Sequence, residues 1–260
     1  MFIAAVTMVK NEADVIRYTI ENLFENQSVS AMIVLDNDSI DGTTDILHEM
    51  ASIYPIEVRP DPEVGYYQSA KMTKLALDAF EIHDADWVVP FDADEYWTST
   101  NGSLPDALIE TKPNMHLAFR LFNYFGRASD DTSIANPFDR ITHRDTNPAP
   151  LFKVAVRNVP GLEILQGNHG AEGAGTDTDG KGFIGHFPWR TFPQWKRKIE
   201  NGYAAYKASD LPETQGGHWR GYGEILRRSG EQGLRNVWDE YFYDPDGIDL
   251  VHETVSSIGK

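Results

Sequence analysis

Three carboxylates fall within four consecutive positions directly after an apolar run. Residues 86–91 read as a buried β-strand, and Asp92, Asp94 and Glu95 follow it. In an extended segment residues i and i+2 point to the same side, so Asp92 and Asp94 can face one ligand while Ala93 turns away. Two carboxylates held this close repel each other unless a cation neutralises them. The pair therefore predicts a site for Mg²⁺ or Mn²⁺, which prefer oxygen ligands and would bridge the carboxylates to a diphosphate.

The alternative interpretation of these carboxylates is a solvated turn, because turns favour Asp. Phe91, Tyr96 and Trp97 flank the cluster and argue against a fully exposed loop. The cluster is therefore interpreted as part of a site.

Two other polar clusters also follow apolar runs. They are residues 10–12, after the run 2–8, and residues 36–38, after the run 31–35. Apolar periodicity further predicts helices over 15–24, 42–52 and 66–82, and strands over 56–59 and 87–91. Apolar strands that alternate with amphipathic helices indicate an α/β fold with a mostly parallel sheet covered on both faces. Ligands of such sheets bind beyond the carboxyl ends of the strands, so all three clusters are expected along one edge.

The second half of the sequence is less regular. Residues 117–125 and 151–157 are predicted strands, and residues 171–182 are glycine-rich without apolar periodicity, which predicts a loop. Such a loop is interpreted either as a lid over a bound ligand or as a disordered insertion. His169 and His186 bracket it, and either could be the third metal ligand, with His186 favoured because it follows a short apolar run.

A helical region is expected from residue 192 onward. Trp195, Ile199, Tyr203 and Tyr206 recur at helical spacing, with basic residues 196–198 between them. A basic amphipathic helix can lie on an anionic membrane. The negative charge of the whole chain favours instead a core-packed helix with a solvated basic side.

Composition excludes several classes of function. With 40 acidic and 23 basic residues the formal net charge is −17, so nucleic acid is not expected as a partner. The absence of cysteine removes disulfides, zinc–thiolate sites and thiol nucleophiles. The first residues lack the basic region of a signal peptide and soon become polar, so neither a leader nor a transmembrane segment is expected. We expect a cytoplasmic location, with peripheral contact to the inner face of the membrane as an option.

Two segments resemble a known family. Residues 35–43 (LDNDSIDGT) resemble the VDDGSTDGT signature of family 2 glycosyltransferases, with Asp38 where the signature usually has glycine, and residues 91–95 resemble their Asp-x-Asp motif. The sequence is similar to the subgroup with KNE after the first strand and a late H-[FY]-P-x-R-[ST] segment, here residues 186–191. The resemblance implies a GT-A fold that binds a nucleotide-sugar, with a UDP-sugar favoured, together with Mn²⁺ or Mg²⁺. It also implies inverting transfer of the sugar to a glycan or lipid-linked acceptor.

The resemblance, with the chemistry of the transfer, gives a set of candidate site residues. The residues expected to bind the nucleotide-sugar are Lys10, Asn11, Glu12, Asp36, Asp38, Lys71, Lys74, Asp92, Arg190 and Lys198. The expected metal ligands are Asp92, Asp94 and His186. An inverting transfer needs a base at the acceptor hydroxyl, and Glu172, His169 and Glu95 are the candidates.

The expected organisation is one GT-A catalytic domain over residues 1–190, with a nucleotide-sugar half (1–100) and an acceptor half (101–190). A helical C-terminal extension over residues 191–260 follows. Two other functions stay open, a nucleotidyltransferase or other enzyme of nucleotide-sugars, and a non-catalytic nucleotide- or sugar-binding module. The first of these would usually carry a glycine-rich phosphate loop after its first strand, and residues 8–12 contain no glycine.

Overall fold

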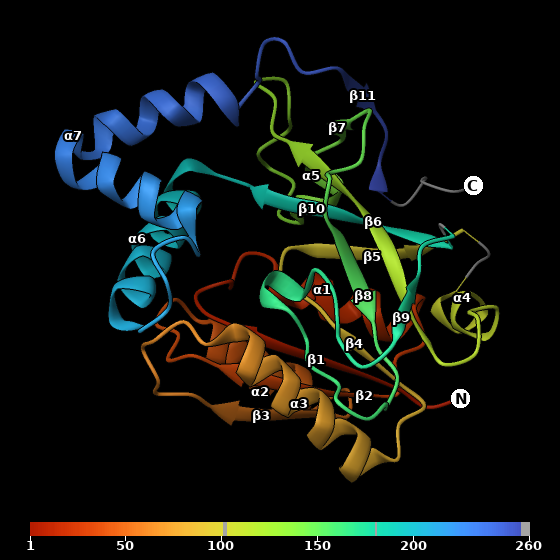
Figure 1. Ribbon diagram of the computed structural model, residues 1–260. Coiled ribbons are helices and arrows are strands. Elements are labelled where there is room, and N and C mark those ends of the chain that lie inside the picture. Colours follow the sequence, from red (N-terminus) through yellow and green to blue (C-terminus); the bar gives the residue numbers. More distant parts are fainter. Residues whose placement is uncertain (101–102, 180, 256–260) are drawn as a thin grey trace.

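The computed structural model describes residues 1–100, 103–179 and 181–255. A four-stranded parallel sheet, sheet A, forms the first part of the fold (Figure 1). Its spatial order is β3-β2-β1-β4, with β1 at Ile3–Val9, β2 at Ala31–Asp36, β3 at Ile56–Pro60 and β4 at Trp87–Pro90. The carboxyl ends of these strands therefore lie at one edge of the sheet.

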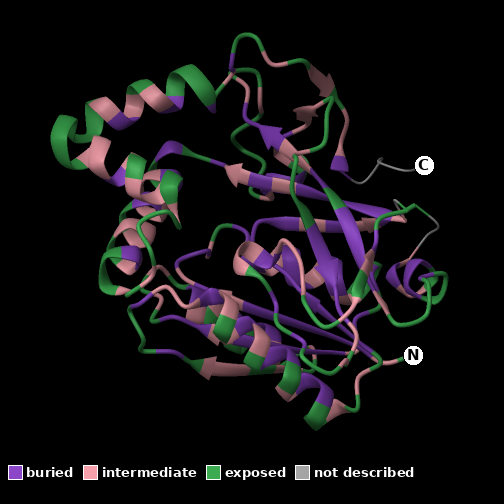
Figure 2. Cartoon of the chain, in the orientation of Figure 1, coloured by how far each residue is buried: buried purple, intermediate pink, exposed green. Residues whose placement is uncertain are grey.

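Strands β1, β2 and β4 of sheet A are buried on both faces, as their apolar sequences require, whereas the edge strand β3 is partly exposed. Along β1, Ile3 and Ala5 pack with helices α1 (Ile16–Glu21) and α2 (Thr43–Ala51) on one face. Ala4 and Val6 pack on the other face with helix α3 (Gln68–His83). Helix α1 continues into a π-helical turn, η1, at Asn22–Asn26. Figure 2 shows most of the buried residues in the central strands, with exposed residues on the outer sides of the helices.

A second, mixed sheet, sheet B, packs beside the first. Its strands are β5 (Glu95–Ser99), β6 (Met115–Phe125), β7 (His143–Asp145), β8 (Phe152–Ala155), β9 (Gly175–Asp177), β10 (Gly182–Trp189) and β11 (Leu250–His252). Strand β6 pairs in parallel with β9 and β10 and antiparallel with β7 and β8, while β5 is antiparallel to β10. Residues 91–94 lead the chain from β4 in sheet A to β5 in sheet B, so the three carboxylates lie where the two sheets meet.

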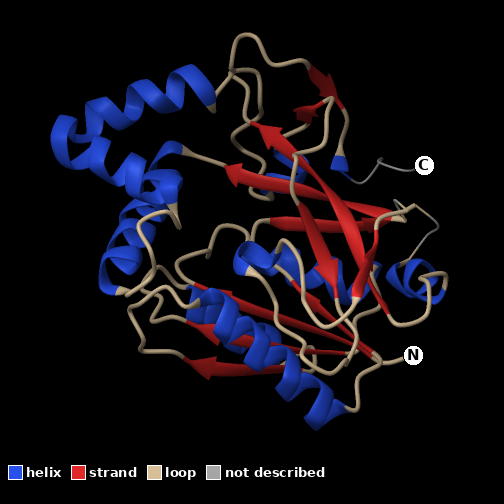
Figure 3. Ribbon diagram, in the orientation of Figure 1, coloured by secondary structure: helices blue, strands red, loops and turns tan. Residues whose placement is uncertain are grey.

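The remaining helices are α4 (Leu104–Ile109), α5 (Pro137–Arg140), the 3-10 turn η2 (Gln166–Asn168), α6 (Phe192–Ala208) and α7 (Gly217–Tyr241). Helices α6 and α7 pack against each other through an aromatic core that includes Trp195, Trp238 and Phe242. They lie together beside the ends of both sheets (Figure 3). No helix in the described ranges combines the length and the apolar character needed to cross a bilayer.

The predicted α/β architecture, with a parallel sheet flanked by helices and a helical C-terminal region, is confirmed. The prediction of a loop over residues 171–182 was wrong in part, because Gly175–Asp177 forms β9 against the start of β6. This strand has only three residues, and its pairing depends on a partner distant in sequence, which periodicity cannot detect. Gly180, within the same predicted loop, lies outside the described residues.

Candidate active site

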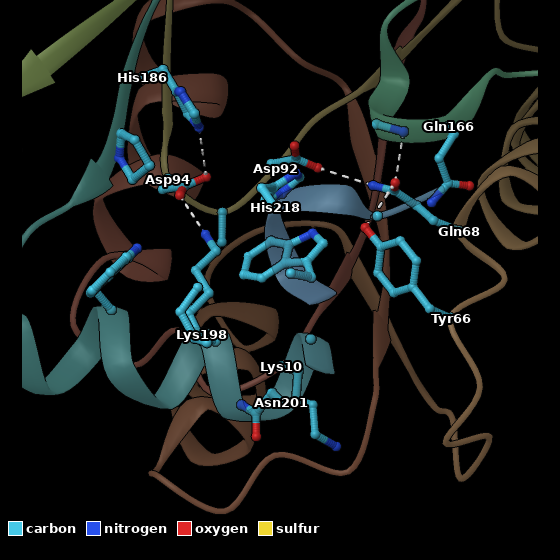
Figure 4. Close-up of a pocket in the computed structure, with 18 of the residues that line it drawn as sticks. Lys10, Tyr66, Gln68, Asp92, Asp94, Gln166, His186, Lys198, Asn201 and His218 are labelled. Carbon is cyan, nitrogen blue, oxygen red and sulfur yellow. Dashed lines mark hydrogen bonds and ion pairs between the residues drawn. The ribbon is translucent and has the colours of Figure 1, made fainter. Parts of the chain in front are cut away.

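A cavity of about 640 Å³ lies where the carboxyl ends of β1 and β4 meet β10, α6 and the start of α7 (Figure 4). It is the size of a typical small-molecule site. The residues predicted from sequence that line it are Lys10, Glu12, Asp92, Asp94, His169, His186 and Lys198. Residues from both predicted halves of the catalytic domain and from the predicted C-terminal extension therefore share one cavity.

Asp94 is almost completely buried at this cavity, with 1% of its surface exposed. Its Oδ2 accepts a hydrogen bond from Lys198 Nζ at 2.6 Å and lies 3.5 Å from Arg190 Nη1. Burial disfavours the ionised carboxyl, but the cationic side chains of Lys198 and Arg190 outweigh it and lower the pKa of Asp94. Asp94 is therefore a carboxylate at neutral pH.

His186 faces the other oxygen of Asp94. Its Nδ1 lies 2.8 Å from Asn123 Oδ1, an acceptor, so the ring proton of a neutral imidazole resides on Nδ1. Burial lowers the pKa of His186 to about 4, which makes the neutral form the dominant one. The lone pair on Nε2 then faces Asp94 Oδ1 at 3.8 Å, as Figure 4 shows. Two acceptors that face each other in a buried site are satisfied by a cation placed between them.

Asp94 and His186 fit a divalent metal ion, but the structure does not bring all three predicted ligands, Asp92, Asp94 and His186, to one point. No group of three or more His, Asp or Glu side chains is arranged to hold an ion in the ranges that the structure describes. Mg²⁺ and its relatives commonly use one or two protein ligands and complete their shell with substrate phosphates and water. Asp94 and His186 could supply that protein share.

Asp92 has different hydrogen-bond partners from Asp94. Its Oδ2 accepts from Lys153 Nζ at 2.5 Å, and its Oδ1 accepts from Asn168 Nδ2 at 3.0 Å. Lys153 also forms an ion pair with Glu95 Oε1 at 2.8 Å and donates to the carbonyl of Gly167 at 2.7 Å. Only 2% of Lys153 is exposed.

The expectation that residues 92–94 continue an extended strand was wrong. The chain turns at residues 93–94, and the Glu95 N–H donates to the Asp92 carbonyl at 3.2 Å. Strict alternation of side chains therefore does not apply to Asp92 and Asp94. Both line the cavity, but they bind different protein groups.

Arg190 joins the two motifs that define the resembled subgroup. Its Nη2 lies 2.5 Å from Glu12 Oε2, and its Nε donates to Asp14 Oδ2 at 2.8 Å. The side chain is fully buried. Burial opposes its charge, but the carboxylates of Glu12 and Asp14 outweigh that effect and raise the pKa of Arg190. Lys198 Nζ reaches the second oxygen of Glu12 at 3.2 Å, so the end of β1, the end of β10 and α6 are tied together by charge.

The ends of β1 and β2 form another part of the cavity wall. Lys10 and Asn37 line it, and Lys10 Nζ donates to the Asn37 carbonyl at 2.5 Å. Asp36 lies outside the cavity lining and accepts from Ser39 N–H and Thr44 Oγ1. Asp38 also lies outside it and has a φ of 55°, in the left-handed region that favours glycine and tolerates Asp. This backbone explains how Asp38 occupies a position where the resembled signature has glycine.

Three further predicted donor-site residues lie away from the cavity lining. Lys71 forms an ion pair with Asp61 at 2.6 Å, and Lys74 forms one with Asp78 at 3.0 Å. Asn11 is buried, and its Oδ1 accepts from Ile40 N–H.

The three candidate bases occupy different environments. Glu172 is exposed and does not line the cavity. Glu95 is fully buried beneath it, and burial raises the pKa of Glu95 to about 7. His169 lines the cavity, and its Nδ1 lies 2.9 Å from the Phe152 carbonyl, so a neutral ring carries its lone pair on Nε2. The absence of a side chain at Gly167 makes room for that ring, since a methyl group there would come within 2.7 Å of Nε2.

Sequence reasoning missed several residues of the site. Lys153 was not identified, although a single lysine within the apolar run 151–156 is the pattern of a buried, paired charge. Gln68, Asn123 and Asn168 were also missed, and no local pattern marks them.

The fold and the cavity define a class of protein, an α/β protein with a cavity at the carboxyl edge of a parallel sheet that contains a cluster of charged side chains. Residues 4–101 match the profile of Glycosyl transferase family 2. No curated protein matches the chain.

Similar solved structures have low sequence identity. TarS from S. aureus is 12% identical with a TM-score of 0.42, and the match covers 93% of this chain and 44% of TarS. TarS 1-349 in complex with UDP has the same identity and TM-score, with 98% and 97% covered. The mannosyltransferase PcManGT from Pyrobaculum calidifontis, in complex with GDP-Man and Mn²⁺, is 15% identical with a TM-score of 0.45, and 91% of this chain and 73% of that chain are covered. The chain thus spans less than half of the first of these proteins.

Proposed function

We propose that this protein is a GT-A glycosyltransferase that transfers a sugar from a nucleotide-sugar, with inversion, to a hydroxyl of a glycan or lipid-linked acceptor. One observation carries the proposal: the buried carboxylate of Asp94, the neutral His186 and the cationic Lys198 meet in one cavity at the carboxyl edge of sheet A. The family match over residues 4–101 supports the same assignment.

The donor is proposed to lie with its nucleoside at the ends of β1 and β2, near Lys10 and Asn37, and its diphosphate near Asp94. Lys198 is partly exposed, with 25% of its side chain accessible, so it can turn from Asp94 towards a phosphate. A positioned ammonium group there would stabilise the charge that develops on the departing diphosphate. Asp94 and His186 would hold Mn²⁺ or Mg²⁺, and the ion when bound would neutralise the diphosphate.

His169 is proposed as the base that removes the acceptor proton. Of the three candidates it is the one that lines the cavity, and the Phe152 carbonyl orients it with Nε2 free to accept. Burial, followed by the charge of Lys153, lowers the pKa of His169, so the ring is neutral and can take up a proton at pH 7.

Calorimetry with UDP and with GDP, each with and without Mn²⁺, tests the donor site. We expect at least one nucleotide to bind, with Mn²⁺ strengthening the binding, and Asp94→Asn to lose that strengthening. Glu200→Gln, a charge change on the exposed side of α6, is the control and should bind like the wild type. The absence of nucleotide binding by the wild type, with or without metal, would refute the proposal.

Turnover is tested by incubating the wild type and His169→Ala with UDP-GlcNAc or GDP-mannose and a panel of methyl glycosides as acceptors, and measuring nucleotide release and the anomer of the glycosylated product by NMR. We expect His169→Ala to bind donor normally but to lose about a hundredfold or more in transfer rate. Donor binding without release of nucleotide in any condition would instead indicate a non-catalytic binding module.

A further inference from the structure

One wall of the cavity is aromatic, and the proposed donor site makes no use of it. It is built by α6, the start of α7, the residue that follows the end of α7, and the end of β10. The aromatic residues in it are Trp189, Trp195, Tyr206, Trp219, Tyr222 and Phe242. Trp195 and Phe242 are buried in the core between the helices, whereas Trp219 and Tyr222 are only partly buried. Partly exposed aromatic rings inside a cavity are available to a ligand.

Trp219 is held in place by its neighbours. A methyl group at Gly202 would come within 2.6 Å of the Trp219 ring, so the indole lies directly against the backbone of α6. On its own helix the ring packs against His218, with ring centroids 4.7 Å apart at 45°. The indole is therefore a preorganised surface, because its position is fixed before a ligand arrives.

The spacing along α6 relates this surface to the proposed site of reaction. Lys198 binds Asp94, and Asn201 and Gly202 follow three and four residues later, so all three share one face of the helix. At about 1.5 Å of rise per residue, Gly202 lies roughly 6 Å along the axis from Lys198. That separation is close to the length of one sugar ring, so a ring at Trp219 would directly adjoin a sugar whose diphosphate lies at Lys198.

Polar groups accompany the aromatic surface. Asn201 and His218 line the same cavity. A pyranose ring presents C–H groups on its faces and hydroxyl groups around its edge. An indole face with an amide and an imidazole beside it matches both features, whereas an alkyl chain would leave these polar groups unpaired.

We propose that Trp219 is the platform for a pyranose ring of the acceptor, and that Asn201 and His218 bind its hydroxyl groups. The acceptor is thus a carbohydrate, recognised through its terminal ring, rather than a bare lipid alcohol or a protein side chain. His169, the proposed base, lines the same cavity. The assignment of this pyranose as the acceptor rests on the proposed function. The binding of a pyranose at Trp219 is independent of that function.

Saturation-transfer NMR with a panel of methyl glycosides tests the proposal. The panel comprises both anomers of methyl glucoside, galactoside, mannoside and N-acetylglucosaminide, which lack an aliphatic tail. We expect at least one glycoside to receive saturation at its ring protons from the wild type, and Trp219→Ala to weaken its binding about tenfold. Tyr241→Ala, an exposed aromatic residue of the same helix outside the cavity, is the matched control and should bind like the wild type.

Asn201→Ala is a smaller change that keeps the proposal testable if Trp219→Ala does not fold. We expect it to weaken the same glycoside about three- to tenfold, because one hydrogen bond is lost. Folding of each variant is checked by circular dichroism, and UDP and GDP binding with Mn²⁺ is measured in parallel.

The outcomes separate the two proposals. If no glycoside binds the wild type, or if binding survives both Trp219→Ala and Asn201→Ala, the subsite is refuted. If Trp219→Ala weakens UDP or GDP as much as the glycoside, the ring is a nucleobase platform and the subsite is again refuted. If Trp219→Ala and Asn201→Ala weaken glycoside binding as expected but neither UDP nor GDP binds the wild type, the carbohydrate subsite is supported and the proposed transferase function is refuted.

Discussion

The ion pair between Arg190 and Glu12 is predicted to hold the site together. Arg190 is fully buried, Glu12 is nearly so, and their closest atoms are 2.5 Å apart. Removing one partner of a buried pair leaves an uncompensated charge and costs about 3–5 kcal/mol. We therefore expect Glu12→Gln and Arg190→Met each to lower the free energy of unfolding by roughly that amount, a large share of the about 5–15 kcal/mol typical of a domain.

A double-mutant cycle measures the interaction itself. In Glu12→Gln/Arg190→Met neither charge of the pair remains, so the combined loss should be smaller than the sum of the single losses by about 1–3 kcal/mol. The double variant should still be less stable than the wild type, because Arg190 also binds Asp14 and lies near Asp94. The assay is urea denaturation followed by circular dichroism, with the slope of the transition compared between variants.

The pair Lys196–Glu200 on the exposed side of α6 is the matched control. Its atoms are 2.9 Å apart but both side chains contact solvent, so a coupling below about 1 kcal/mol is expected. Strict additivity in the Glu12/Arg190 cycle, or single losses no larger than those of the control, would refute the structural role that we assign to Arg190.

Two further perturbations test the positioning of site residues. Lys153→Met leaves the buried Glu95 without its cation and should lower the free energy of unfolding by about 3–5 kcal/mol, measured by urea denaturation; an unchanged midpoint would contradict the buried network. Gly167→Ala and Gly161→Ala both place a side chain at positive φ, so each should cost about 1–2 kcal/mol of stability. Only Gly167→Ala forces a methyl group against the His169 ring, so it alone should slow sugar transfer, and equal rates in the two variants would count against His169 as the base.

The parallel sheet could be predicted because its strands and helices each carry a clear local pattern. The runs that became β1 and β2 are apolar at nearly every position, and α3 shows helical periodicity over sixteen residues. The second sheet was only partly predicted. Its strands β7, β9 and β11 have three residues each, and they are strands only because β6 or β7 offers them backbone hydrogen bonds.

The sequence indicated several residues of the candidate site, but not the groups that each of them contacts. Asp94, His186 and Lys198 were identified as candidates, and the structure brings them together. Arg190 was expected to contact a diphosphate, but it is enclosed by Glu12 and Asp14, and no pattern in the sequence distinguishes a buried arginine from one that faces a ligand. That role stays a prediction.

The charges around Asp94 predict that a diphosphate binds to this site together with a metal ion. Glu12, Asp14 and Asp94 contribute three acidic groups, while Arg190 and Lys198 contribute two cations. Burial raises the pKa of Glu12, and in the state where Glu12 is ionised and His186 is neutral the cluster carries a net negative charge. A diphosphate that enters this cluster alone meets repulsion from the carboxylates, and the buried setting weakens the screening by water. If Asp94 and His186 hold a divalent ion, as proposed, its charge would reverse the sign of the cluster. We therefore expect metal and diphosphate to bind together far more tightly than either binds alone, and calorimetry of each ligand in the presence and absence of the other measures that coupling directly.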